Sequence, residues 1–263
     1  MKFIDTEITF LNPIYTNKEK YNKNLGNVIQ GIAFFKNNLI TTQSYNKKYL
    51  YFNIFDSSHN VIFNKRIISS SHGQDLSLEI TNTGNIYLYT GGDNWKGINQ
   101  YEILYNNYTN KIIDIIFKKN IPLDITYSTS SISENKKYIV SYSKDKIYIY
   151  YKNKELILLN SFSISEKQQD KNAWIQGIVM RKGLIYLLTS NNSINEYKII
   201  TIYNFEGDII KETNLYTGRE FSVSEGNKWE LEGLAFLNNI LYTTVMTGVD
   251  GANIKRLYRI GSF

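Results

Sequence analysis

The feature that most constrains this 263-residue chain is a short segment that recurs five times. Each copy is an apolar stretch that carries one polar or acidic residue, in most copies followed by a small one, and it continues through a turn into a second strand-like stretch. The polar residues that mark the copies are Gln30, Gln74, Ser131, Gln176 and Glu232. Such repetition indicates a chain built from similar supersecondary units.

The spacing of these five anchor residues identifies the unit. Successive anchors lie 44, 57, 45 and 56 residues apart, whereas a four-stranded propeller blade takes roughly 40 to 50 residues. The third copy, around Ser131, is the most degenerate. We therefore predict an all-β, five-bladed β-propeller in which residues 1–263 form a single domain.

The two ends of the chain predict how the ring closes. Four units contain two further strand-like segments after the first hairpin, but the fifth reaches the last residue, Phe263, one strand short. Residues 2–10 alternate apolar and polar side chains and precede the first anchor without an inner strand of their own. We expect this N-terminal strand to pair with the last blade, which removes open sheet edges.

Composition excludes several function classes. The absence of cysteine excludes disulfides, thiolate chemistry and cysteine zinc sites. We expect no cofactor, no nucleic-acid partner, no membrane span and no standard signal peptide, because none of the corresponding motifs or apolar runs is present. The net charge of +6 would attract an anionic partner, although lysines spread through Asn-rich turns are also typical of a solvated surface. Whether the axis holds a metal is open.

Catalysis has weak support in the sequence. There is no Gly-x-Ser-x-Gly elbow for a serine nucleophile. A glycosidase needs two carboxylates that face each other across a pocket, and among the anchors only Glu232 is acidic, with Asp75 or Glu230 as helpers. We expect a protein that is not an enzyme. A glycan-active propeller enzyme and a propeller scaffold that binds only proteins are the alternatives.

The residues left over suit carbohydrate recognition, which combines aromatic faces with amide and carboxylate groups. We expect Trp174 and Trp229 on the same rim as His72, because all three lie near the start of an inner strand. The predicted ligand-binding residues are His72, Gln74, Trp95, Trp174, Gln176, Trp229 and Glu232. The alternative for each indole is packing between blades, and for His72 a tie between neighbouring blades.

Four segments support a more specific interpretation: Gln30–Ile32, Thr41–Ser44, Ser71–Glu79 and Gly84–Thr90. They contain a Gln-led strand, a Thr-Gln pair at a strand end, a His-Gly start to the next blade and a Glu that closes its first strand. In these features the chain resembles the propeller shared by receptor-binding tail proteins of phages of Gram-positive bacteria and by class III bacteriocins of the helveticin J type. It departs from that family at Ser71, where the family tends to have glycine.

The resemblance implies binding of a bacterial cell-surface glycopolymer, such as teichoic acid, by a protein of a virion tail or of the extracellular space. It also implies other tail proteins and further copies of the chain as partners. The long stem and further domains of those tail proteins are not in this sequence, so trimer formation and virion attachment are not carried over.

Overall fold

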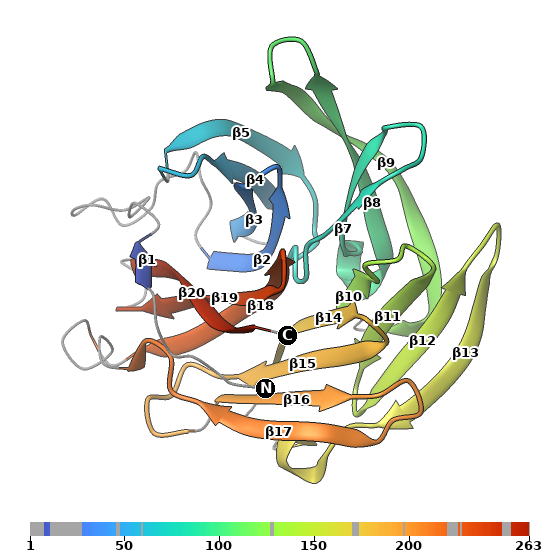
Figure 1. The fold of residues 1–263 in the computed structure, drawn as a ribbon, viewed down its shortest axis with the longest axis vertical. Helices are drawn as coiled ribbons and strands as arrows, with labels where there is room; N and C mark the ends of the chain where they lie inside the picture. The colour runs from blue at the N-terminus through green and yellow to red at the C-terminus, as the bar shows by residue number, and fades with distance from the viewer. Residues whose placement is uncertain are drawn as a thin grey trace.

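The structure is a computed structural model, and it describes residues 8–10, 28–45, 48–58, 60–126, 129–169, 174–196, 198–219, 226, 228–248 and 254–262. Their strands form five four-stranded antiparallel sheets arranged around a common axis (Figure 1). This arrangement confirms the predicted five-bladed β-propeller. Two short 3₁₀ segments, η1 (Asp93–Trp95) and η2 (Glu166–Gln169), lie in the described part of the chain.

Each of the first four blades uses four consecutive strands, named here from the axis outward. Blade 1 is β2 (Val28–Phe35), β3 (Asn38–Tyr45), β4 (Tyr49–Phe55) and β5 (Val61–Ile68), and blade 2 is β6 (Ser77–Ile80), β7 (Ile86–Gly91), β8 (Lys96–Asn106) and β9 (Lys111–Thr126). Blade 3 is β10 (Thr129–Ile132), β11 (Tyr138–Ser143), β12 (Lys146–Lys152) and β13 (Leu156–Ser163). Blade 4 is β14 (Trp174–Arg181), β15 (Leu184–Ser190), β16 (Lys198–Tyr203) and β17 (Ile209–Leu215).

Blade 5 joins the two ends of the chain. It contains β18 (Trp229–Leu237), β19 (Ile240–Thr247) and β20 (Ile254–Ser262), and its fourth strand is β1 (Ile8–Phe10) from the N-terminal region. β1 pairs antiparallel with β20, with Thr9 opposite Leu257. The predicted closure of the ring by the N-terminal strand is therefore confirmed at Ile8–Phe10, which cover the outer edge of β20 at Arg256–Tyr258. Residues 2–7 of the predicted strand lie outside the described residues.

The small residue that follows three of the anchors has a steric cause. The pairing register shifts beside each of these glycines, Gly31, Gly177 and Gly233: it skips the anchor in β2 and β14 and the glycine itself in β18. A Cβ atom on Gly31 would lie 2.6 Å from the backbone nitrogen of Leu76 in the next blade, and one on Gly177 would lie 2.9 Å from Cγ of Leu234. The inner strands thus approach too closely for a side chain, and bulges there turn the anchors toward the axis.

The hydrophobic core lies between neighbouring blades. Phe52 of blade 1 meets Tyr101 of blade 2 edge to face, with ring centroids 4.9 Å apart. Tyr186 of blade 4 meets Phe236 of blade 5 in the same way at 5.1 Å. Because each sheet buries both faces against its neighbours, the apolar and aromatic residues of the repeated strands stabilise the ring as a whole.

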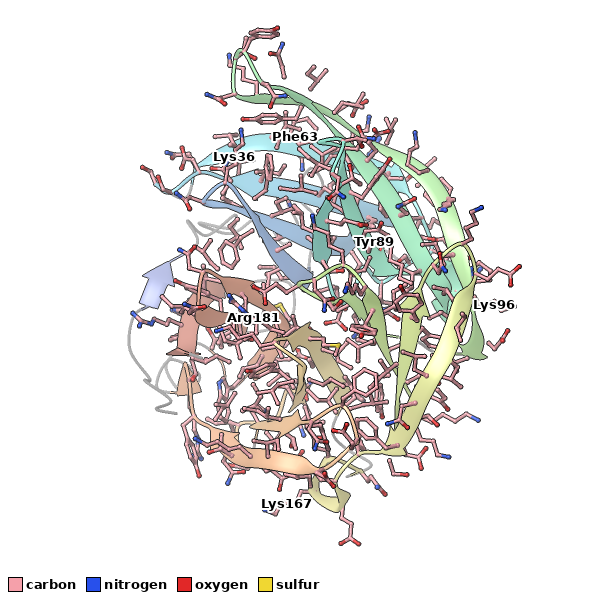
Figure 2. All side chains as sticks on the ribbon, turned by 45° about the vertical axis from the view of Figure 1, so that its right-hand side comes forward. Lys36, Phe63, Tyr89, Lys96, Lys167 and Arg181 are labelled. Carbon is pink, nitrogen blue, oxygen red and sulfur yellow. The ribbon has the colours of Figure 1, made fainter. Side chains whose placement is uncertain are left out.

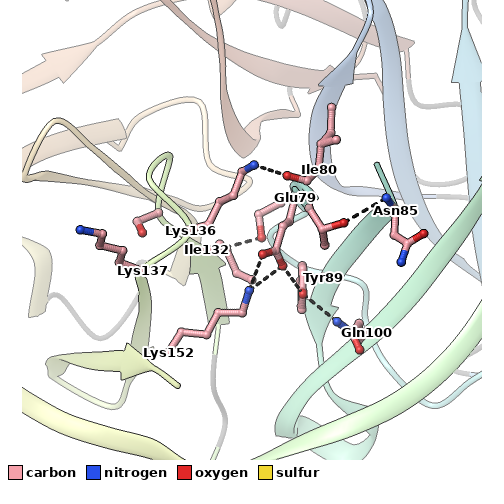
Figure 3. Close-up of polar contacts among 12 residues, drawn as sticks. Glu79, Ile80, Asn85, Tyr89, Gln100, Ile132, Lys136, Lys137 and Lys152 are labelled. Atoms are coloured by element: carbon pink, nitrogen blue, oxygen red, sulfur yellow. Dashed lines mark hydrogen bonds and ion pairs between the residues drawn. The ribbon is translucent and has the colours of Figure 1, made fainter. Parts of the chain in front are cut away.

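A polar cluster also joins blades 2 and 3 (Figure 3). The buried carboxylate of Glu79 accepts hydrogen bonds from the Tyr89 hydroxyl and from Lys152 Nζ, the latter at 2.6 Å, and Gln100 Nε2 donates to the Tyr89 oxygen at 2.7 Å. Burial and the Glu79 carboxylate raise the pKa of Tyr89. Glu79, which the family resemblance singled out, therefore has a structural role, since its charge is fully compensated inside the fold.

Candidate functional site

A cavity of about 540 Å³ opens at the end of the axis where the inner strands begin, and we call it the anchor cavity. Its lining combines amides, carboxyls, cationic groups and aromatic rings from different blades. The residues are Gln30, Ser44, His72, Gln74, Thr129, Tyr142, Trp174, Ile175, Gln176, Asn192, Lys228, Glu230 and Glu232.

Five of the seven predicted ligand-binding residues meet in this cavity, although they are spread over 160 residues of sequence. They are His72, Gln74, Trp174, Gln176 and Glu232. The degenerate third blade contributes Thr129 and Tyr142, whereas its predicted anchor, Ser131, lines a cavity at the opposite end of the axis.

A chain of hydrogen bonds crosses the cavity wall through four blades. Thr129 donates to Gln74 Oε1 at 3.2 Å, and Gln74 Nε2 donates to Gln176 Oε1 at 3.2 Å. Gln176 Nε2 donates to Glu230 Oε1 at 2.8 Å. Each amide uses its oxygen toward one blade and its nitrogen toward another, so every side chain in the series has one fixed orientation.

His72 continues this polar ring toward blade 1. Its Nδ1 lies 3.3 Å from Gln30 Oε1, an acceptor, so the geometry favours the tautomer with the proton on Nδ1. The ring is partly buried and lines the cavity. His72 therefore ties two neighbouring blades together and also faces the site, which combines the two roles weighed from the sequence.

The two glutamates of β18 form a tight pair on one wall. Gln176 Nε2 lies 2.8 Å from Glu230 Oε1 and 3.4 Å from Glu232 Oε1. Burial raises the pKa of both carboxyls, and the Glu230 charge raises that of Glu232 further. Lys228 Nζ lies 3.5 Å from Glu230 Oε2 and opposes the shift there. Glu230 is thus the member of the pair that carries the charge more readily, while burial favours the neutral acid at Glu232.

Asp75 is a buried carboxyl that follows the cavity residue Gln74 in the chain. Its backbone is left-handed, with φ of 51°, and its Oδ1 accepts a hydrogen bond from the Ile178 nitrogen of blade 4 at 2.9 Å. This contact spans the ring between two blades that are not neighbours. Oδ2 of Asp75 and Oε2 of Glu232 are both buried and make no hydrogen bond. Burial raises the pKa of the Asp75 carboxyl well above its ordinary value, so the neutral acid is favoured.

The three tryptophans have different positions. Trp174 is 51% exposed and forms part of the cavity wall. Trp229 is only 1% exposed, packs in the blade 4–5 core, and donates from Nε1 to the Thr217 carbonyl at 2.8 Å. The expectation that Trp229 presents a face to a ligand is therefore wrong. The side chain of Trp95 lies outside the described residues.

Sequence reasoning left Lys228 and Glu230 out of the predicted ligand-binding residues, although a simple pattern places both beside the predicted Glu232. Lys228, Glu230 and Glu232 alternate with Trp229 and Leu231, and side chains two residues apart on a strand share a face. This alternation places the charged residues together and the indole on the opposite, core-facing side. Gln30 was identified as an anchor but omitted from the predicted site, although its equivalence to Gln176 was visible in the Gln-Gly-Ile repeat.

The chemistry of the cavity suits hydrogen bonding to a neutral or polyhydroxylated ligand. In glycosidases, two carboxyls flank the scissile bond, roughly 5 to 9.5 Å apart, on opposite sides of the substrate. Here both carboxyls stand on one strand and share one amide nitrogen.

Among the described residues, no cluster of three or more His, Asp or Glu side chains is arranged to hold a metal ion. In the same part of the chain, no helix has the length and apolar character needed to cross a membrane.

Comparisons with known proteins bear on the fold. No protein-family model matches the chain, and no curated protein sequence matches it. Among solved structures, the tail fiber of Staphylococcus aureus phage P68 is similar, with a TM-score of 0.66, 19% identity, and coverage of 98% of this chain and 53% of that chain. The chain thus spans about half the length of that tail fiber.

Two carbohydrate-active enzymes share the fold at lower similarity. An exo-β-1,3-galactanase from Phanerochaete chrysosporium has a TM-score of 0.57, 9% identity, and coverage of 96% of this chain and 64% of that chain. A putative exo-β-1,3-galactanase from Bifidobacterium bifidum has a TM-score of 0.52, 11% identity, and coverage of 88% and 85%. At these identities the likeness establishes the propeller fold that this chain has in common with a tail fiber and with glycosidases.

Proposed function

We propose that this chain is a receptor-binding propeller of a phage tail, and that its anchor cavity binds a glycopolymer of the bacterial cell surface. The observation that carries the proposal is the convergence of an exposed indole, Trp174, with oriented amides and carboxyls in one cavity of about 540 Å³. The structural likeness to a phage tail fiber supports the biological setting. The resemblance to helveticin J bacteriocins stays a prediction, and so does a bacteriocin-like role.

The lining supports a sugar-containing ligand on chemical grounds. Sugar hydroxyls both donate and accept hydrogen bonds. The cavity offers oriented amides, which carry a donor and an acceptor each, together with the Glu230 carboxylate as an acceptor. The exposed face of Trp174 suits the apolar side of a pyranose ring. These groups are oriented before a ligand arrives, which lowers the entropy cost of binding.

The overall charge supports an anionic polymer such as teichoic acid. The chain carries a net charge of +6, so it attracts a polyphosphate over distances of about a Debye length, near 10 Å at 0.1 M salt. Affinity for the polymer should therefore fall as salt rises. The short-range contacts with the sugar units, by contrast, should change little with salt.

Glycan hydrolysis is the second candidate, favoured by the galactanase-like fold. We propose binding rather than hydrolysis because Glu230 and Glu232 lie side by side and already share Gln176. A retaining or inverting mechanism needs its acid and its base or nucleophile on either side of the sugar. Incubation of the protein with cell-wall polysaccharide should produce no new reducing ends. Their appearance, with loss in Glu232→Gln, would make the enzyme assignment correct.

The proposed site is tested by binding to purified cell wall. We expect Trp174→Ala to weaken binding at least about tenfold, a change of about 1.4 kcal/mol, because the stacking face is removed. The matched control is Tyr108→Ala, since Tyr108 is fully exposed at the tip of the β8–β9 hairpin and lies outside the cavity. Wild-type affinity of a folded Trp174→Ala variant would refute the site.

A further inference from the structure

The other end of the axis carries a second cavity, of about 420 Å³, which we call the turn cavity. It is lined by residues of all five inner strands, and in every blade except blade 2 these residues lie next to the turn that leads into the second strand. Most of its lining residues are apolar, among them the partly buried Phe34, Leu78, Val179 and Phe236, and polar groups complete the lining. Nothing in the proposed function uses this cavity.

Basic residues gather in the turns around it. Described turns of blades 1, 3 and 4 at this end carry five cations and one carboxylate. The cations are Lys36, Lys136, Lys137, Arg181 and Lys182, and the carboxylate is Glu134. Figure 2 shows Arg181 toward the middle of the ring. The inner turns around the turn cavity therefore carry a net positive charge, in contrast to the anchor cavity with its paired carboxyls.

Only one of these cations meets a carboxylate among the described contacts. Arg181 lies 3.1 Å from Glu134 Oε1 and 4.7 Å from the centroid of the Phe236 ring. Lys136 donates to the backbone carbonyl of Ile80 (Figure 3), which is uncharged. Lys36 donates to the Tyr105 hydroxyl at 3.0 Å, again an uncharged acceptor. Their positive charges remain available to a partner.

The two remaining lysines extend from the surface. Lys137 and Lys182 are exposed, and Figure 3 shows Lys137 directed away from the polar cluster of blades 2 and 3. Lys182, like Lys36 and Lys136, has a left-handed backbone, with φ of 49°, 49° and 64° respectively. Glycine and asparagine adopt this conformation more readily than lysine does. The charge of the side chain, rather than the turn, is thus the reason we infer for lysine there.

We propose that the turn cavity and its basic turns bind an acidic protein segment that inserts one apolar side chain into the cavity. The positive charges of the basic turns favour an acidic partner. The apolar residues that line the turn cavity favour the inserted apolar side chain. The proposal rests on the proposed function for its setting: if the anchor cavity faces the cell surface, the turn cavity faces the structure that carries the propeller. A glycopolymer fits less well, because the described lining of the turn cavity lacks the series of oriented amides found in the anchor cavity.

The probe is a fluorescein-labelled peptide with three acidic residues on each side of one phenylalanine, titrated at low salt and followed by fluorescence anisotropy. We expect the double variant Lys137→Glu and Lys182→Glu to weaken binding at least tenfold. The matched control is Lys48→Glu with Lys144→Glu, which makes the same charge change in exposed turns at the anchor end and should alter affinity less than twofold. Replacing the phenylalanine of the peptide by serine should weaken binding at least fivefold.

Two results would overturn the proposal. One is unchanged peptide affinity in the Lys137→Glu, Lys182→Glu variant. The other is equal affinity for the phenylalanine peptide, its serine counterpart and poly(glycerol phosphate), which would make this end a general polyanion surface. Cell-wall binding is measured on the same variants. Trp174→Ala should lose cell-wall binding and keep peptide binding, whereas the Lys137→Glu, Lys182→Glu variant should do the reverse. Each proposal can therefore fail without the other.

Discussion

The two ends of the propeller axis share one scaffold but differ in chemistry. The anchor cavity is lined by amides that bond to one another and by the Glu230–Glu232 pair, whereas the turn cavity is lined mostly by apolar residues and bordered by basic inner turns. The same five inner strands build both cavities, one at each end of the axis. The difference shows that the repeat fixes where side chains converge, while individual residues at strand ends determine what can bind there.

The strongest way to break the comparison is to remove the scaffold that both ends share. We expect Gly31→Val to destabilise the fold by about 3 kcal/mol or more, since its Cβ would lie 2.6 Å from the Leu76 nitrogen and 2.9 Å from the Gly73 carbonyl oxygen. Denaturant unfolding measures this. Gly84→Asn is the control, because no atom lies within 4 Å of a Cβ there and asparagine tolerates its positive φ. Equal stability of the two variants would contradict the close approach of the inner strands.

The carboxyls of the anchor end should make stability depend on pH. The folded-state pKa values of Asp75 and Glu232 are raised, so above pH of about 4 the folded protein holds protons that the unfolded chain has released. The free energy of unfolding should therefore fall as pH rises, by up to about 1.4 kcal/mol per pH unit and group, until the raised pKa is passed.

Glu232→Gln isolates this effect, because the amide imitates the neutral acid. We expect the variant to show a shallower loss of stability between pH 5 and pH 8 than the wild type, measured by denaturant unfolding at each pH. The exposed Glu166→Gln is the control and should keep the wild-type slope. A wild-type slope in Glu232→Gln would show that this carboxyl is ionised in the folded protein.

A smaller effect is expected when the amide series of the anchor end is cut. Gln176→Leu keeps much of the side-chain volume but removes the group that joins Gln74 to Glu230. We expect cell-wall binding to weaken about threefold to tenfold, and binding of the acidic peptide at the turn end to stay unchanged. Isothermal titration with both ligands checks this, and equal losses at both ends would show that the two cavities are coupled.

The smallest expected effect is on cell-wall binding when charges at the turn end are reversed. The variant Lys137→Glu, Lys182→Glu should bind cell wall within about twofold of wild type at physiological salt, since both residues lie at the turn end, and a Debye length of about 8 Å screens exposed charges at longer range. A cell-wall sedimentation assay is sufficient. A tenfold loss would place polymer binding on the basic turns instead of in the anchor cavity.

The fold was predictable from the sequence because the number and spacing of the repeated segments correspond to the number and size of the blades. The anchor spacing predicted five blades, and the unpaired strand pattern of residues 2–10 predicted closure. The glycines after Gln30, Gln176 and Glu232 were visible as a pattern, but their cause, the contact between inner strands, required coordinates.

The site was predictable only in part. Both Trp174 and Trp229 precede an anchor closely, but Trp174 lies two residues before Gln176 and Trp229 three residues before Glu232. Strand alternation therefore separates the two, and the structure shows one exposed and the other buried. Asp75 could not have been placed, because its left-handed backbone and its contact with Ile178 of a distant blade follow from three-dimensional packing alone.

The central claim is that the polymer binds in the anchor cavity against Trp174, and the three indole N–H signals of the ¹⁵N-tryptophan-labelled protein test it most directly. On titration with purified cell-wall polymer, the Trp174 signal should shift, while that of Trp229, held by the Thr217 carbonyl inside the core, should stay in place. Binding that leaves the Trp174 signal unmoved would contradict the account.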